Sequence, residues 1–140
     1  MRVVLDTGIL VAAVRSRTGA SRLWLRAALM REVTPLLSVT LALEYEAVLT
    51  RPDMLAAAGA SALEMNRLLN AVIAVCEPVK VAFLWRPMLR DPNDEMVLEV
   101  AVSGRADRLL TFNVKDFAGA EQLGVRIEQP GPAWRTWRQK

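Results

Sequence analysis

Short apolar runs alternate with longer segments of helical periodicity along this chain. The runs are residues 2–5, 35–38, 77–81, 108–111 and 124–128. Helical patterns lie between them, up to about residue 14, at 22–32, 40–50 and 61–75, and from Asp91 to about Ser103. Strands joined through helices pair in parallel and are covered on both faces, so this alternation predicts an α/β protein. We expect a three-layer α/β/α sandwich on a mostly parallel sheet of four to five strands.

Several residues mark where these elements begin and end. Ser21 is a candidate N-cap for the helix at 22–32, and Gly104 suits the C-cap of the helix that begins near Asp91. The pair Arg51-Pro52 should end the helix at 40–50, because a residue before proline avoids the α-helical conformation. Pro78 predicts that the run at 77–81 is an edge strand.

The chain has 140 residues, of which 53% are hydrophobic and 24% charged, so it has enough apolar side chains for a core. We expect one domain over residues 1–140, with a short tryptophan-bearing tail from about residue 130. Trp134 and Trp137 lie three residues apart in that tail, with Arg135 and Arg138 beside them. The tail would suit nucleic acid, but docking of the two indoles on the body of the protein or on a second subunit is the preferred interpretation.

No histidine occurs in the sequence. Its absence excludes Ser-His-Asp hydrolases and nearly every zinc or haem site. The single cysteine, Cys76, excludes an intramolecular disulfide and is expected to be an inert thiol in a reducing compartment. No apolar run is long enough to span a membrane, and Asp6 interrupts the first run too early for a signal peptide. We therefore expect a cytoplasmic protein with no membrane partner, and its net charge of +3 is only a weak argument for nucleic acid.

Acidic residues fall near the predicted carboxyl ends of strands, where parallel α/β folds bind their ligands. Asp6 directly follows the first run, where a functional carboxylate and a helix cap are equally good interpretations. Asp91, Asp94 and Glu95 lie at the beginning of a helix. Asp91 followed by Pro92 resembles a capping arrangement, which taken alone favours capping over catalysis.

Two further segments bring acids toward the same edge. The run at 108–111 leads to Thr111, Asn113 and Asp116, of which the last two also suit a turn. Glu44 lies at one rim of the apolar stripe of its helix, so the helical wheel modestly prefers it to Glu46 as an inward acid, although a solvated position is more usual for such a residue. Converging carboxylates repel one another unless a cation is present, and all-oxygen ligation selects Mg²⁺ or Mn²⁺. The residues alone thus predict a metal-dependent phosphodiesterase.

Four motifs, in this order, resemble those of PIN-domain proteins. They are Val3-Val4-Leu5-Asp6-Thr7, Leu43-Glu44-Tyr45-Glu46-Ala47-Val48-Leu49-Thr50-Arg51-Pro52, Arg90-Asp91-Pro92-Asn93-Asp94-Glu95 and Leu110-Thr111-Phe112-Asn113-Val114-Lys115-Asp116-Phe117. The match spans about residues 2 to 117 and is similar, more narrowly, to VapC-like toxin components of bacterial type II toxin–antitoxin pairs. The resemblance implies a PIN-like α/β/α sandwich and an endoribonuclease that uses Mg²⁺ or Mn²⁺ to cut RNA. It also implies a homodimer that a small cognate antitoxin inhibits.

The same resemblance implies roles for individual residues, though it assigns none to RNA binding. The catalytic acids would be Asp6, Glu44, Asp94 and Asp116, of which Asp6, Asp94 and Asp116 would bind the metal. Supporting residues would be Thr7, Asp91, Glu95, Thr111 and Asn113. The chain departs from the family twice, since Gly8 replaces a common Asn and Asn113 stands where many relatives have Asp. The fourth ligand therefore stays open, with Asp91 and Glu95 as rivals of Asp94.

Two other classes of function compete with the nuclease. An aspartyl phosphoryl-transfer domain also has Asp at the ends of parallel strands, but it needs a lysine that reaches the phosphate. Lys115 is the candidate, and it falls in a predicted turn. A catalytically weakened PIN-fold module that binds nucleic acid or an antitoxin is the second alternative, which Gly8 favours.

Overall fold

Five parallel strands form the sheet, in the order β3-β2-β1-β4-β5. The computed structural model describes residues 1–81, 89 and 91–138. The strands are β1 (Arg2–Leu5), β2 (Thr34–Leu37), β3 (Glu77–Pro78), β4 (Arg108–Leu110) and β5 (Arg126–Glu128). Every pairing is parallel, as predicted. The edge strand β3 is shorter than the predicted 77–81, because its partner β2 ends at Leu37, where Ser38 caps the next helix.

The connections between strands are helical. The α-helices are α1 (Thr7–Arg15), α2 (Ala20–Leu29), α3 (Val39–Leu49), α4 (Pro52–Ala58), α5 (Ala62–Val75), α6 (Pro92–Ser103) and α7 (Pro130–Arg138), and the 3₁₀ helices are η1 (Val114–Phe117) and η2 (Ala120–Leu123). The predicted end of a helix at Arg51-Pro52 is confirmed, and Pro52 begins the unpredicted α4, since a proline in the first turn loses no helical hydrogen bond. Among the described residues, no helix combines the length and apolar character needed to cross a membrane.

The predicted helix ends are mostly confirmed. Gly104 is the C-cap of α6, and the side chain of its N-cap, Asp91, accepts a hydrogen bond from the N–H of Asn93. The prediction for Ser21 is wrong, because α2 begins at Ala20 with Gly19 as its N-cap. Ser21 therefore lies inside the first turn, where its side chain is buried.

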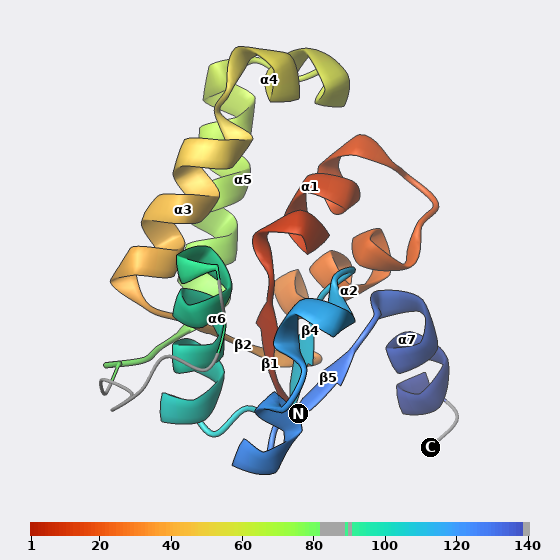
Figure 1. The fold of residues 1–140 in the computed structure, drawn as a ribbon. Coiled ribbons are helices and arrows are strands. Elements are labelled where there is room, and N and C mark those ends of the chain that lie inside the picture. The colour runs from red at the N-terminus through yellow and green to blue at the C-terminus, as the bar shows by residue number, and fades with distance from the viewer. Residues whose placement is uncertain (82–88, 90, 139–140) are drawn as a thin grey trace.

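The helices cover both faces of the sheet (Figure 1). On one face α1 contacts β1 and α5 contacts β2, and α2 lies against both α1 and α5. Helix α6 contacts β1, β2 and β4. From β1 the chain moves outward to β2 and β3, and it then returns through α6 to β4 on the other side of β1. Because such connections are right-handed, the outward and returning helices lie on opposite faces. The three-layer α/β/α sandwich is thereby confirmed.

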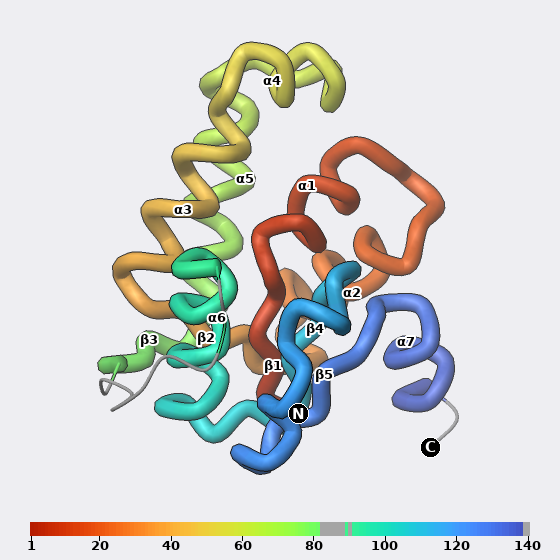
Figure 2. Tube along the Cα trace, in the orientation of Figure 1, coloured from red at the N-terminus to blue at the C-terminus, as the bar shows by residue number. Residues whose placement is uncertain are grey.

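A helical arm stands beside the edge of the sheet where β1 ends. Figure 2 shows α3 and α5 running side by side, with α4 at their far end. Helix α3 also contacts α1 and α6, so the arm is packed against both layers. This arrangement brings the helix that carries Glu44 to the carboxyl edge of the sheet.

The C-terminal helix α7 packs on α2 through three tryptophans. The fully buried Trp24 makes an edge contact with Trp134 and a stacked contact with Trp137, at centroid distances of 5.2 and 5.3 Å. The indole N–H of Trp24 donates a hydrogen bond of 2.9 Å to the carbonyl of Pro130. The guanidinium of Arg138 lies over both tail indoles. Docking of these indoles on the body of the protein is therefore confirmed.

Arg2, the first residue of β1, joins three elements. Its guanidinium makes two hydrogen bonds to the Glu77 carboxylate, at 2.9 and 2.5 Å, and also donates to the carbonyl of Gly104. Its backbone N–H donates to the Asp107 carboxylate at 2.8 Å. These contacts attach β3 and the end of α6 to the start of β1.

Candidate active site

The ends of β1 and β4 lie together at the point where the strand order reverses. Asp6 follows β1, and Thr111 follows β4. The Thr111 hydroxyl donates a hydrogen bond of 2.7 Å to Oδ2 of Asp6, and the Asp6 N–H donates to the Leu110 carbonyl at 3.0 Å. Parallel α/β folds bind ligands at such a reversal, because the helices on the two faces diverge there. Asp6 thus occupies the expected ligand position, with its carboxylate oriented by Thr111.

The surroundings of the half-buried Asp6 raise the pKa of its carboxyl. Burial is the largest cause, since it disfavours the charged form, and the charges of Asp91 and Asp116 add to it. Hydrogen bonds from the Thr111 hydroxyl and the Thr7 backbone lower the pKa, because they stabilise the carboxylate. Asp6 is the N-cap residue of α1 by position, but its side chain makes no capping hydrogen bond to the second or third residue of the helix, so it does not serve as a side-chain cap.

Asp94 lies in the first turn of α6 and experiences the same charges. Burial, followed by the charges of Asp6, Asp91 and Asp116, raises its pKa from 3.8 to about 6. A carboxyl in such surroundings retains its proton more readily than one in water, unless a cation approaches. Asp6, Asp91 and Asp116 are therefore near enough to Asp94 for their charges to act on it.

Asp91 and Glu95, the rivals of Asp94, have local structural partners. Oδ1 of the N-cap residue Asp91 accepts a hydrogen bond of 2.8 Å from the N–H of Asn93. The buried carboxylate of Glu95 accepts a hydrogen bond from the N–H of Leu89, which offsets the cost of removing it from water. Local hydrogen bonds hold both side chains, and the charge of Asp91 also raises the pKa values of Asp6 and Asp94.

Asn113 and Asp116 belong to the turn that follows β4. The Asn113 N–H donates to the Thr111 hydroxyl at 3.1 Å, and the Asn113 carbonyl accepts from the Asp116 N–H at 2.9 Å. Asn113 therefore shapes the turn, as predicted, and it does so through its backbone N–H and carbonyl. Asp116 is exposed on η1 and contributes charge to the site, since it raises the pKa values of Asp6 and Asp94.

Glu44 is half-buried on α3. It is not among the charges that raise the pKa of Asp6 or Asp94, which come from Asp91 and Asp116 in both cases and, for Asp94, from Asp6 as well. Within residues 1–81, 89 and 91–138, no three acidic or cysteine side chains already form a group that could hold a metal ion. The acids therefore lie close together but are not arranged as a finished set of ligands.

Sequence reasoning missed the neighbour of Glu44. Tyr45 is buried among the apolar residues of α3, and its hydroxyl donates a hydrogen bond to the carbonyl of Leu5, directly before Asp6. A tyrosine within a buried stripe is a usable signal, because its hydroxyl needs a partner there. The sequence did not show which partner it would find.

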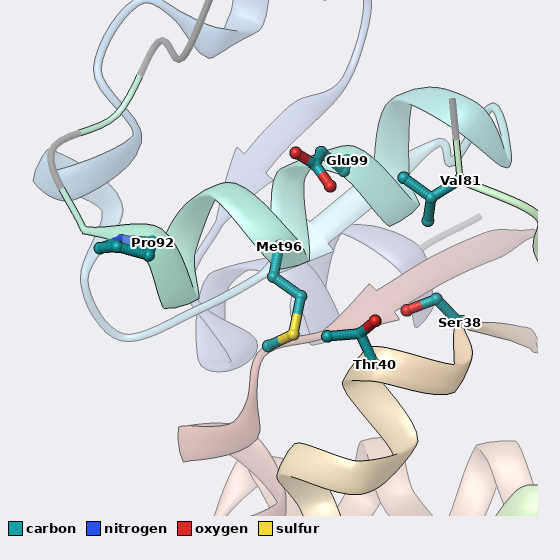
Figure 3. Close-up of a pocket in the computed structure, with 6 residues that line it drawn as sticks. All are labelled: Ser38, Thr40, Val81, Pro92, Met96 and Glu99. Atoms are coloured by element: carbon teal, nitrogen blue, oxygen red, sulfur yellow. The ribbon is translucent and has the colours of Figure 1, made fainter. Parts of the chain in front are cut away.

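A cavity of about 210 Å³ lies between α6 and the beginning of α3, and sequence reasoning missed it too. Figure 3 shows Met96 pointing from α6 toward Thr40. Burial raises the pKa of Glu99 at the rim, and the charge of Glu95 adds to this effect. The cavity is lined by Ser38, Thr40, Val81, Pro92, Met96 and Glu99.

Cys76 has a different character from the acids. It is half-buried at the end of α5, and burial raises the pKa of its thiol to about 12. A thiol with so high a pKa is scarcely ionised near neutral pH, so it is a poor nucleophile, as expected.

The fold and the site define a parallel α/β protein with gathered acids at its strand-order reversal. The sequence model for the PIN domain matches residues 2–115, and the chain belongs to the PIN domain family. No curated protein matches it. Its fold is similar to that of a chain in the crystal structure of VapBC2 from Rickettsia felis bound to a DNA fragment from their promoter. The TM-score is 0.62 and the sequence identity 16%, over 92% of this chain and 98% of that chain.

Proposed function

We propose that this PIN-domain protein is a metal-dependent endoribonuclease and the toxin component of a toxin–antitoxin pair. The observation that supports this most is the concentration of negative charge around Asp94, to which Asp6 and Asp116 contribute. Acids held together in this way favour a bound cation, because each charge disfavours the next. The proposed catalytic acids are Asp6, Glu44, Asp94 and Asp116, in a single domain formed by residues 1–140.

The donor chemistry fits Mg²⁺ or Mn²⁺. Asp6, Asp94 and Asp116 would supply carboxylate oxygens, which such hard cations prefer. These acids are not a finished set of ligands, and a cation held among them would offset the repulsion between their charges. When bound, the ion would activate a water and stabilise the charge that develops on the phosphate.

The neighbouring residues would position the acids. The Thr111 hydroxyl fixes Oδ2 of Asp6, and the Thr7 backbone also stabilises this carboxylate. The cap at Asp91 and the buried Glu95 hold the first turn of α6, which carries Asp94. Asn113 holds the turn that leads to Asp116. The proposed supporting residues are therefore Thr7, Asp91, Glu95, Thr111 and Asn113.

The partners follow from the family and from the structural likeness. VapBC2 of Rickettsia felis was crystallised bound to promoter DNA. By analogy, we propose that this chain is a cytoplasmic homodimer that binds a cognate antitoxin and cuts RNA. An antitoxin that inserts an Arg or Lys among Asp6, Asp94 and Asp116 would replace the charge of the metal.

A catalytically weakened module that binds nucleic acid or an antitoxin is the second candidate. The exposed Gly8 favours it, because position 8 offers no polar side chain beside Asp6. Titration of Mn²⁺ into the metal-free protein distinguishes the two. One or two sites support the nuclease, whereas no binding supports the module.

The proposed activity is tested with single-stranded RNA in Mg²⁺ or Mn²⁺. We expect cutting that stops in chelator and is abolished by Asp6→Asn and by Asp94→Asn. Asp53→Asn is a matched control, because Asp53 is exposed in the first turn of α4, as Asp94 lies in the first turn of α6. Cutting that persists in both site variants, or in chelator, would disprove the proposed site.

A further inference from the structure

Phe112 is an exposed aromatic ring beside the acids. It is 46% exposed, although the preceding Thr111 is fully buried and binds Asp6. Among the described residues, eight large hydrophobic side chains are exposed, and Phe112 is the aromatic one of them. Tyr45 and Phe117 are buried. Single exposed apolar residues are common on proteins, so its position requires further argument.

The ring lies against the start of α1. A Cβ atom at position 8 would be 3.9 Å from Cδ2 of Phe112, so Gly8 and this ring are neighbours. Gly8 is itself exposed and carries no side chain that would cover the ring. The ring is therefore accessible to solvent beside Gly8, which lies two residues after Asp6 in the sequence. The proposed function places the phosphate of the substrate at Asp6.

The backbone on both sides of Phe112 is held in place. The Thr111 N–H donates to the Glu128 carbonyl at 3.0 Å, and the Asn113 N–H donates to the Thr111 hydroxyl at 3.1 Å. The turn then continues to the buried Phe117. A planar ligand that binds the ring would therefore lose little free energy in ordering the loop.

We propose that Phe112 is a stacking platform for a nucleobase of single-stranded RNA. The choice of RNA rests on the proposed function, because the base would stack while a neighbouring phosphate lies at the acids. The exposed Lys115, in the same turn, can contact a further phosphate. The neighbours Asn113 and Lys115 are polar, which favours a nucleotide over the apolar face of a protein partner. Every base has a flat face, so the contact sets position along the strand rather than sequence preference.

The test measures equilibrium binding of fluorescently labelled single-stranded RNA in chelator, so that metal-dependent cutting does not interfere. Phe112→Ala should weaken binding about 5- to 100-fold, as expected for one stacked base. Phe112→Trp should retain the affinity, and Phe112→Leu, which is apolar but not flat, should lose it. Leu63→Ala is the matched control, because Leu63 is 60% exposed on α5, and it should leave binding unchanged.

A second series removes one base at a time from the RNA. At one position, an abasic nucleotide should weaken binding to wild type by the factor that Phe112→Ala produces, and should not weaken binding to Phe112→Ala further. Such non-additivity identifies a direct contact between the ring and that base. Wild type that does not bind RNA, full affinity in Phe112→Leu, or additive losses at every position would each overturn the proposal.

These measurements separate the stacking platform from the nuclease. A protein that binds as expected but cuts no RNA contradicts the nuclease and supports the platform. A protein that cuts RNA while Phe112→Ala binds and cuts like wild type overturns the platform alone. Melting temperatures should match wild type, because the side chain is exposed; if Phe112→Ala melts lower, the comparison of Phe112→Trp with Phe112→Leu decides the question.

Discussion

The hydroxyl of Tyr45 donates a hydrogen bond of 2.5 Å to the carbonyl oxygen of Leu5. Both residues are buried, Tyr45 on α3 and Leu5 at the end of β1. Glu44 precedes the tyrosine, and Asp6 follows the leucine. The bond therefore joins the helix that carries one proposed catalytic acid to the strand that leads to another.

Tyr45→Phe should lower the free energy of unfolding by about 1–3 kcal/mol, because the buried Leu5 carbonyl would lose a partner. Unfolding in urea measures the loss. Thr136→Val is the control, since the Thr136 hydroxyl bonds the Pro132 carbonyl in an exposed position, and it should cost less than about 0.5 kcal/mol. Equal losses in the two variants would contradict a special role for the buried bond.

Asp94→Asn should stabilise the metal-free protein near neutral pH. The pKa of Asp94 is raised from 3.8 to about 6, so the folded state binds this proton more tightly than the unfolded state does. The resulting stability is present below about pH 4 and is lost as the pH rises through about 6. We expect a gain of about 1 kcal/mol, after allowance for partial exposure and for the helix N-terminus, which favours the negative charge.

Unfolding of wild type and Asp94→Asn, followed in chelator across this pH range, tests the sign of the effect. The advantage of the variant should grow as the pH rises. Lower stability of Asp94→Asn at neutral pH would instead identify Asp94 as an acid that serves the helix terminus.

Mg²⁺ should raise the melting temperature of wild type, because a ligand that binds only the folded state stabilises it by mass action. The effect is about 2.7 kcal/mol at a concentration one hundred times the Kd. Asp94→Asn should show a smaller shift, and Asp53→Asn the full shift. Thermal melts with and without metal decide the matter, and a wild type that responds to neither Mg²⁺ nor Mn²⁺ speaks against the metal site.

Trp137→Ala should destabilise the protein by about 2 kcal/mol, since it removes apolar contact together with the stacking on Trp24 and the edge contact with Trp134. Trp137→Phe should recover about half of the loss. The near-ultraviolet circular dichroism of the tryptophans reports the change directly. A silent Trp137→Ala would mean that α7 is held to α2 by other contacts.

Helix ends could be predicted where they depend on neighbours in the chain. The cap at Asp91, the end at Gly104 and the break at Arg51-Pro52 all follow from local backbone chemistry. The prediction that Ser21 is an N-cap was wrong because a residue that can cap a helix does not fix where the preceding loop ends and the helix begins. Helix α4 was missed because seven residues are too few for a clear periodicity.

The sequence could predict at which edge of the sheet the candidate site lies, but not the contacts within it. The ends of parallel strands meet, so Asp6 and Thr111 could be placed together from their order alone. Their hydrogen bond spans 105 residues of sequence, and no local pattern specifies such a pairing. Likewise, the periodicity of α3 put Glu44 at a rim but could not show that its charge is not among those that raise the pKa of Asp94.

Arg2 secures the amino end of the strand whose other end leads to Asp6. At the start of the four-residue strand β1, Arg2 is paired with the opposite charges of Glu77 and Asp107. Just after its end, Asp6 lies near the like charges of other acids. Attachment and chemistry thus occupy opposite ends of one strand. This separation makes the scaffold tolerant of redesign, because carboxylates at the far end can be exchanged or neutralised while the anchoring contacts to β3 and α6 remain.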